Sequence, residues 1–182
     1  MATAGRTLVL GGQRSGKSRY AEELVIASGR APVYLATAAA GDAEMAERIG
    51  MHRARRGEQW RTVEAPLDLA GALKRETGAG YHVLVDCLTL WVSNLMMAEH
   101  NIEDETAGLL DALTEVAGPV VLVSGEVGLG VIPGDRLSRR FADALGTVNQ
   151  RVAAVVDRVV LVAAGLPLVL KAEQTNTEAA EI

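Results

Sequence analysis

Near its amino terminus the chain reads Gly11-Gly12-Gln13-Arg14-Ser15-Gly16-Lys17-Ser18. An apolar run, residues 7–10, comes immediately before this stretch, and residues 20–27 follow it with apolar side chains at helical spacing. The stretch fits the pattern G-x-x-x-x-G-K-[ST], which is informative when it joins a strand to a helix. A glycine-rich turn that merely connects the two elements is the alternative, but it does not require Lys and Ser in this register. We therefore interpret the stretch as a P-loop that binds a nucleoside triphosphate.

The residue types of this loop suit a polyphosphate. Gly11 and Gly16 let the backbone turn sharply and bring successive N–H groups close to the phosphates. The helix that we expect to begin near Ser15 adds the positive end of its dipole. Lys17 reaches the β- and γ-phosphates and is a predicted catalytic residue, whereas the Ser18 hydroxyl is a predicted Mg²⁺ ligand.

The composition is that of a globular protein of one domain. The 182 residues are 49% hydrophobic and 23% charged, with a net charge of -5, and this acidic balance argues against a nucleic-acid partner. The single cysteine, Cys87, cannot form an internal disulfide, and the sequence shows neither a signal peptide nor a run of about 18 apolar residues. We expect a cytoplasmic protein without a membrane span, with one catalytic domain over residues 1–171 and a polar tail over residues 172–182.

Short apolar runs alternate with helical patterns along the chain. Strands are expected at residues 8–10, 33–36, 83–86, 120–124 and 159–163, and helices at residues 16–28, 43–56, 67–77, 88–98, 104–117 and 135–157. Continuously apolar strands are typical of a parallel sheet covered on both faces. Residues 159–170 instead predict two strands around a turn at residues 165–167. The predicted fold is α/β: a three-layer, RecA-like P-loop NTPase with a mostly parallel sheet and an antiparallel C-terminal hairpin.

Three of the expected strands end in groups with useful chemistry. In open α/β sheets, ligands collect outside the carboxyl ends of the strands. Asp86 ends an apolar strand, which is the position of a Walker B carboxylate that holds Mg²⁺ directly or through water. Glu126 follows another strand and precedes a glycine-rich loop, which is either a substrate cover or an ordinary strand exit. Thr37 follows a third strand, where it is placed to face a nucleotide.

Residues 44–57 form the most unusual segment. At helical spacing Glu44, Arg48 and His52 share one face, and basic residues crowd the histidine on its carboxyl side. A solvated helix surface with paired charges is the ordinary interpretation. The surrounding cations disfavour a protonated imidazole, however, so His52 is also a candidate nucleophile, and the same cations can hold a triphosphate.

Several blocks beyond the P-loop follow one another in a specific order. They are Arg-Ile at residues 48–49 with His-Arg at residues 52–53, Trp-Arg-Thr-Val-Glu at residues 60–64, Glu-Val-Gly-Leu-Gly-Val-Ile-Pro at residues 126–133, Asp-Arg-Leu at residues 135–137 with Arg-Phe at residues 140–141, and Gly-Thr-Val-Asn-Gln-Arg at residues 146–151. With the P-loop they resemble the bifunctional adenosylcobinamide kinase/adenosylcobinamide-phosphate guanylyltransferase family of cobalamin biosynthesis. The resemblance covers about residues 8–171.

The resemblance implies that His52 is catalytic: it attacks the α-phosphate of GTP, releases pyrophosphate and carries GMP as a phosphoramidate. Glu64 suits guanine, because a carboxylate accepts hydrogen bonds from both N1–H and the N2 amine. Ser18 and Asp86 are the implied metal residues. The implied guanine-nucleotide contacts are Gly11, Gly12, Gln13, Arg14, Ser15, Gly16, Lys17, Ser18, Thr37, Ala38, Ala39, Arg53, Ala54, Arg55, Arg56, Glu64 and Asp86.

The reaction implied by the resemblance has two halves. The aminopropanol hydroxyl of adenosylcobinamide first attacks the γ-phosphorus of a triphosphate, GTP or ATP, held by the P-loop with Mg²⁺. GMP then moves from His52 to adenosylcobinamide phosphate and gives adenosylcobinamide-GDP. The corrinoid is expected in a broad cleft near residues 128–133 or at a subunit boundary, and the family implies a homotrimer.

The chain departs from the family's pattern at two positions. Asp86 stands where some members have Glu, a change that keeps metal binding and alters reach. Gly125 stands where Asn is expected before Glu-Val-Gly, so a contact of that amide is absent or replaced by water.

Other functions remain open from the residues alone. A simple P-loop kinase would use His52 only to clamp phosphates and would form no covalent GMP-enzyme. A nucleotide-gated binding protein would bind GTP without corrinoid-dependent turnover. A RecA-like motor fits poorly because the chain is short and acidic and has no evident DNA-binding stripe.

Overall fold

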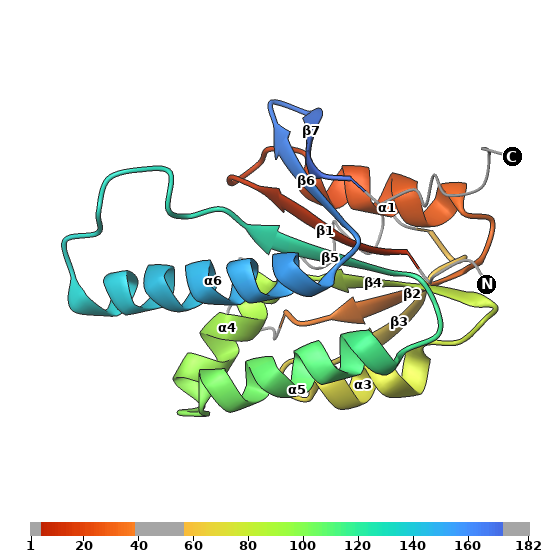
Figure 1. Ribbon diagram of the computed structural model, residues 1–182, viewed down its shortest axis with the longest axis horizontal. Helices are drawn as coiled ribbons and strands as arrows, with labels where there is room; N and C mark the ends of the chain where they lie inside the picture. The colour runs from red at the N-terminus through yellow and green to blue at the C-terminus, as the bar shows by residue number, and fades with distance from the viewer. Residues whose placement is uncertain (1–4, 39–56, 173–182) are drawn as a thin grey trace, which may run out of the picture.

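A computed structural model of the chain describes residues 5–38 and 57–172 (Figure 1). The expected helix at residues 43–56 and the polar tail from residue 173 onward lie outside these described residues. The elements, in chain order, are β1 (Arg6–Gly11), α1 (Lys17–Ala27), β2 (Ala31–Ala36), β3 (Arg61–Glu64), α3 (Leu69–Glu76), β4 (Tyr81–Asp86), α4 (Leu88–Met97), α5 (Ile102–Glu115), β5 (Val120–Gly125), α6 (Arg136–Val155), β6 (Arg158–Ala163) and β7 (Leu166–Lys171).

Seven strands form one sheet in the order β3-β2-β4-β5-β1-β6-β7. Every neighbouring pair is parallel except β6 and β7. The carboxyl ends of the parallel strands therefore meet at one edge of the sheet, which is where the P-loop follows β1. The five strands predicted from apolar runs and the second strand of the predicted hairpin are all present. The sheet also contains β3, which is too short and too polar to stand out in the sequence.

Helices cover both faces of the sheet and make the three layers predicted from the sequence (Figure 1). Helix α1 packs on one face, where its Ala21 and Val25 are fully buried against side chains such as Val9 and Leu84. The larger core lies on the other face beneath α3, α4, α5 and α6. It includes the fully buried Trp91, whose indole N–H donates to the Leu67 carbonyl at 2.9 Å. Within the described residues, no helix is long and apolar enough to cross a membrane.

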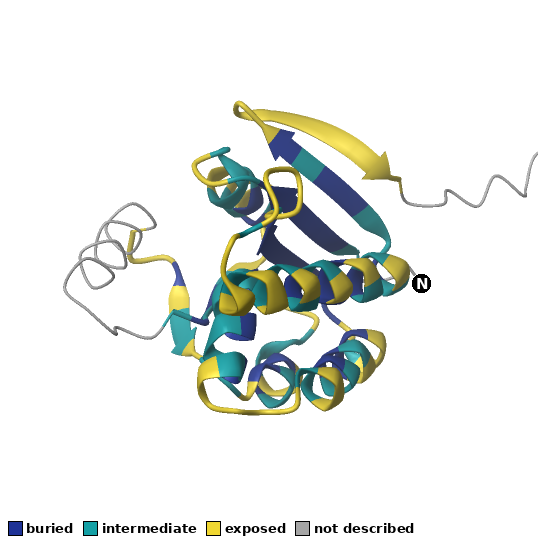
Figure 2. Ribbon diagram, turned by 90° about the vertical axis from the view of Figure 1, so that its left-hand side faces the viewer, coloured by how far each residue is buried: buried dark blue, intermediate teal, exposed yellow. Residues whose placement is uncertain are grey.

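The C-terminal hairpin forms as predicted, but its turn lies one residue earlier. Ala164 (φ 51°) and Gly165 (φ 80°) make a two-residue turn, the kind in which both central residues have positive φ. Pro167 lies inside β7 and pairs with Val162. Strand β7 is the outer strand of the sheet and is exposed along its whole length (Figure 2), a position where proline is tolerated.

His82 is a buried histidine whose protonation should make the stability of the protein depend on pH. It lies near the start of β4 with only 8% of its surface exposed, and within the described chain neither ring nitrogen has a hydrogen-bond partner. Burial, helped by the positive charge of Arg30, lowers the pKa of His82 from 6.5 to about 4. Because the unfolded chain binds this proton more readily, the free energy of unfolding should rise with pH between about 4 and 6.5.

We expect the wild-type protein to lose about 2 kcal/mol of this free energy between pH 7 and pH 5 through His82 alone. Urea unfolding of wild type and His82→Phe at the two pH values measures the effect. The variant has no titrating ring, so its loss should be smaller by this amount. Equal losses in the two proteins would show that His82 is not buried as a neutral ring.

Candidate nucleotide-binding site

The P-loop begins where β1 ends and leads directly into the start of α1. Gly16 caps the helix with a left-handed backbone (φ 97°) and provides no side-chain hydrogen bond to the first turn. The first N–H groups of α1 are therefore available to an anion. Lys17 is the first residue of the helix, and its ammonium donates to the Gly12 carbonyl at 3.1 Å across the loop.

The turn of the β6–β7 hairpin holds the P-loop from one side. The Gly165 N–H donates to the Ser15 carbonyl at 2.8 Å. A Cβ added to Gly16 would lie 3.3 Å from the Gly165 Cα, and one added to Gly11 would lie 2.6 Å from the Val162 carbonyl oxygen. Gly11 and Gly16 therefore leave room for β6 and for the hairpin turn, in addition to any room that they leave for a ligand.

Two hydroxyl groups of the loop are suited to phosphate and metal. The Ser15 hydroxyl is buried and has no hydrogen-bond partner among the described residues, which fits an acceptor from outside the protein. Ser18 lies in the first turn of α1 and is half-buried.

Asp86 ends β4 on the face of the sheet that α1 covers. The alternation of β4 puts it on the side of Leu84, which packs in the core beneath α1. The Tyr34 hydroxyl donates to Asp86 Oδ2 at 3.1 Å and orients the carboxylate. One carboxylate and one hydroxyl, beside substrate phosphates and water, are the donors that Mg²⁺ commonly uses, so Asp86 and Ser18 fit this ion.

Thr37 connects the ends of β2 and β4. Its hydroxyl donates to the Cys87 carbonyl and accepts from the Cys87 N–H, both at 2.7 Å, while the Asn94 amide donates to the Thr37 carbonyl at 2.7 Å. The hydroxyl is therefore engaged with the backbone, and a nucleotide contact at Thr37 stays a prediction. Burial, with the nearby charge of Asp86, raises the pKa of the Cys87 thiol to about 11, so this thiol is not a nucleophile near neutral pH.

Glu126 leaves β5 next to the P-loop, because its N–H donates to the Gly11 carbonyl at 3.0 Å. Gly125, just before it, is fixed by two side chains to which the sequence analysis gave no role. Its N–H donates to the Thr89 hydroxyl at 2.6 Å, and its carbonyl accepts from the Asn149 amide at 3.0 Å. A Cβ at position 125 would lie 2.8 Å from the Thr89 oxygen, so Thr89 occupies the space that Asn would need there.

Glu64 lies at the same edge of the sheet as the P-loop, where the carboxyl ends of the parallel strands meet, but at the far side of that edge. It ends β3, pairs with Ala36 of β2 and is exposed. Four strand spacings of about 4.8 Å separate β3 from β1, so the ends of the two strands are about 19 Å apart. Glu64 thus lies at the carboxyl ends of the strands, as the P-loop does, but well away from the P-loop.

The structure leaves part of the predicted site undescribed. Ala38 follows Thr37 and is half-buried. Six predicted residues lie outside the described residues, and their roles stay predictions. They are Ala39, His52, Arg53, Ala54, Arg55 and Arg56.

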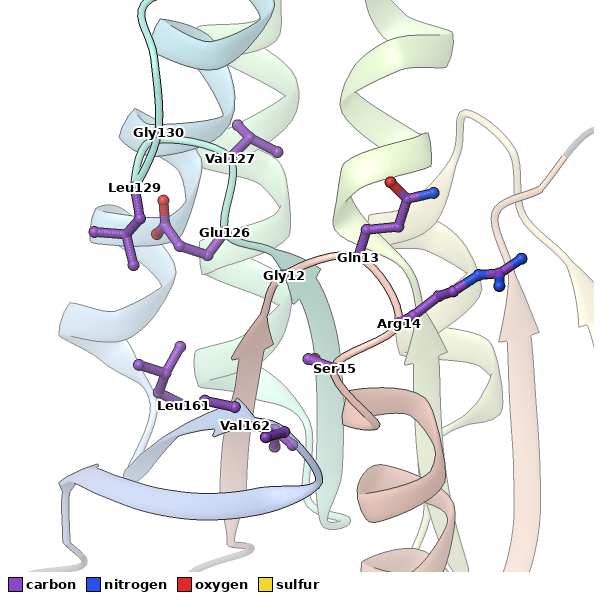
Figure 3. A pocket seen from close by; sticks show the side chains of 12 residues that line it. Gly12, Gln13, Arg14, Ser15, Glu126, Val127, Leu129, Gly130, Leu161 and Val162 are labelled. Carbon is purple, nitrogen blue, oxygen red and sulfur yellow. The ribbon is translucent and has the colours of Figure 1, made fainter.

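A pocket of about 590 Å³ adjoins the P-loop on the side of β6 (Figure 3). The P-loop forms one wall, the loop after β5 forms the second and the end of β6 forms the third. The Glu126 and Leu129 side chains lie on the second wall, whereas Gln13 and Arg14 point to the opposite side of the P-loop. The lining consists of residues 12–15, 126–127, 129–130 and 161–164.

Comparison with solved structures agrees with this architecture. The RadB recombinase superimposes with a TM-score of 0.53 at 18% identity, over 88% of this chain and 74% of that chain. The flagellar accessory protein FlaH from Methanocaldococcus jannaschii gives 0.53 at 13% identity, over 94% and 80%. At such identities the likeness shows the fold alone, and it confirms the predicted P-loop NTPase fold.

Sequence comparison is more specific. The bifunctional adenosylcobalamin biosynthesis protein CobP of Pseudomonas aeruginosa is 51% identical over 170 residues, which is 92% of this chain and 98% of that protein. Its counterpart CobU of Salmonella typhimurium is 40% identical over 181 residues, 90% and 98% of the two chains. The family profile described as cobinamide kinase / cobinamide phosphate guanyltransferase matches residues 7–170. With the P-loop and Asp86 placed at one edge of the sheet, these matches show that the chain belongs to the cobinamide kinase / cobinamide phosphate guanyltransferase family of enzymes.

Proposed function

We propose that the protein phosphorylates adenosylcobinamide and then converts the product to adenosylcobinamide-GDP with GMP taken from GTP through a guanylylated His52. The family match over residues 7–170 carries this proposal. It is supported by relatives that are named bifunctional adenosylcobalamin biosynthesis proteins and by the phosphate-binding geometry of the P-loop.

In the kinase half, the P-loop N–H groups and Lys17 hold the phosphates of ATP or GTP. The aminopropanol hydroxyl attacks the γ-phosphorus, the bond from this phosphorus to the β–γ bridging oxygen breaks, and the nucleoside diphosphate leaves. The hydroxyl proton passes to solvent. Ser18 and Asp86 would hold Mg²⁺, which would supply positive charge beside the phosphates. The protein's own contribution is positioning, together with the positive charge of Lys17.

In the transferase half, a ring nitrogen of His52 attacks the α-phosphorus of GTP and pyrophosphate leaves. A phosphate oxygen of adenosylcobinamide phosphate then attacks the same phosphorus, which breaks the nitrogen–phosphorus bond and frees the histidine. The cations Arg53, Arg55 and Arg56 stabilise the charge on the phosphates. Glu64 accepts the N1–H and N2 hydrogen bonds of guanine, a pair that adenine does not offer.

The corrinoid substrate needs a broad apolar surface beside the γ-phosphate. The loop after β5 offers one, because Leu129, Val131 and Ile132 are all largely exposed. We propose that adenosylcobinamide and its phosphate dock along this loop, near residues 128–133.

The covalent intermediate can be tested directly. Wild-type protein incubated with Mg²⁺ and GTP labelled at the α-phosphate should yield a labelled band after denaturing separation, and His52→Ala should yield none. The label should be lost in acid and retained in base, as expected of a phosphoramidate. His100→Ala is the matched control, because His100 is exposed and hydrogen-bonded to Glu105, and this variant should label like wild type. A protein that binds GTP but never labels would instead be a P-loop kinase without the covalent step.

The role of Glu64 predicts a selective defect. Removing a charged acceptor of two base hydrogen bonds typically costs on the order of 1.5–3 kcal/mol, so Glu64→Ala should need roughly 10- to 100-fold more GTP for half-maximal labelling. Phosphorylation of adenosylcobinamide by ATP should change less than twofold under the same conditions. Because Glu64 is exposed at a strand end, the variant should keep wild-type thermal stability. Equal losses in GTP-dependent labelling and in ATP-dependent phosphorylation would contradict a guanine-binding role for Glu64.

A further inference from the structure

Glu126 is an acidic residue beside the P-loop to which the proposed reaction gives no part. It follows Gly125, the last residue of β5, which lies opposite Gly11 in the parallel register of β1 and β5. The Glu126 N–H donates to the Gly11 carbonyl at 3.0 Å. Glu126 therefore stands about one strand spacing, roughly 4.8 Å, from the backbone of Gly12 in the P-loop.

Lys17 marks the place of the phosphates in this arrangement. Its ammonium donates to the Gly12 carbonyl at 3.1 Å, and in loops of this type the lysine contacts the β- and γ-phosphates. Lys17 and Glu126 thus bond to consecutive residues of the loop, Gly12 and Gly11. A triphosphate on the loop has its reacting end beside Glu126 as well as beside Lys17.

The Glu126 carboxylate is oriented and still open to a ligand. Its Oε1 accepts from the Gly128 N–H at 2.6 Å, which fixes the direction of the side chain. Within the part of the chain that the structure describes, no lysine or arginine forms an ion pair with Glu126. The residue is half-buried and lines the pocket beside the P-loop (Figure 3), so the carboxylate adjoins space that a ligand can enter.

Glu126 also begins the loop along which we place the corrinoid. Leu129, Val131 and Ile132 follow it within six residues, and their side chains are largely exposed. The residue therefore stands between the phosphate site and the surface proposed for the second substrate. A substrate hydroxyl that reaches the γ-phosphate from this loop must pass the Glu126 carboxylate.

The other described acids near this edge of the sheet are less suitable. Asp86 accepts a hydrogen bond from a tyrosine hydroxyl and fits a metal ion. Glu64 ends β3, about 19 Å across the sheet from β1. Asp135 caps α6 by accepting from an N–H of its first turn. Of these side chains, only Glu126 adjoins both the P-loop and the corrinoid-docking loop.

We propose that Glu126 is the general base of the kinase half. The inference rests on the proposed phosphorylation of adenosylcobinamide. As the aminopropanol oxygen bonds to the γ-phosphorus, its O–H bond breaks and the proton passes to the Glu126 carboxylate, and from there to solvent. The bond from the γ-phosphorus to the β–γ bridging oxygen breaks, and the nucleoside diphosphate leaves with the electron pair. Protein kinases use an aspartate in the same way.

Glu126→Gln removes the base and keeps the size of the side chain. General-base catalysis typically contributes 10²- to 10⁴-fold, so kcat for phosphorylation of adenosylcobinamide by ATP should fall about 100-fold. The glutamine oxygen still accepts from the Gly128 N–H, and the change adds no negative charge beside the phosphates. AMP-PNP affinity in calorimetric titration with Mg²⁺, and KM for adenosylcobinamide, should therefore stay within about twofold of wild type.

A small carboxylate should replace the missing base in a shorter variant. Glu126→Ala leaves space beside the P-loop, so formate should raise its kcat about fivefold or more, whereas Glu126→Gln fills this space and should not respond. Glu115→Gln is the matched control, because Glu115 lies at the end of α5 and its ion pair with Lys74 is exposed. This variant should match wild type in every measurement.

The outcomes separate the base from the rest of the proposed function. If wild type phosphorylates adenosylcobinamide and Glu126→Gln does so within about threefold of its kcat, the base role alone is overturned. A loss of AMP-PNP affinity as large as the loss of kcat, or no response of Glu126→Ala to formate, would overturn it equally. A wild-type protein that does not phosphorylate adenosylcobinamide would instead overturn the kinase half of the proposed function.

Discussion

The contact between the P-loop and the β6–β7 turn is the constraint on which the site depends. Gly165 donates to the Ser15 carbonyl, and the Val162 carbonyl lies so close to Gly11 that no side chain fits between them. A loop that binds phosphates through backbone N–H groups needs a fixed backbone, since each N–H contributes only when it is correctly aimed. The antiparallel hairpin at the end of the chain therefore does more than extend the sheet, because its turn determines the shape of a loop 150 residues earlier.

The other side of the P-loop is held through β5. Two side chains from the opposite face, Thr89 of α4 and Asn149 of α6, bond the N–H and the carbonyl of Gly125. Glu126, the next residue, bonds back to Gly11. The helices of the larger core are thereby connected to the phosphate site through one strand end. This network accounts for Gly125, because the Thr89 hydroxyl takes the space and the hydrogen-bonding position that a side chain at 125 would use.

The sequence predicted the architecture well, because its strands are continuously apolar and its P-loop sits between a strand and a helix. It also placed Asp86 correctly at the end of a strand. It missed β3, a strand of only four residues with a charged residue at each end. It placed the hairpin turn at residues 165–167 rather than 164–165, because Pro167 looks like a turn residue but pairs within β7. Asn149 belongs to a block that carried the family resemblance, but its bond to Gly125 joins residues 24 positions apart and has no local signature.

The width of the sheet bears on how one small domain could serve the two proposed nucleotide reactions. Under the proposed function, the kinase half requires attack on the γ-phosphorus and the transferase half requires attack on the α-phosphorus, so the nucleophiles must meet different atoms of a triphosphate. The two nucleophiles must therefore approach the P-loop from different places. The sheet offers such places, since β5, β4, β2 and β3 extend it on one side of β1 and the β6–β7 hairpin extends it on the other.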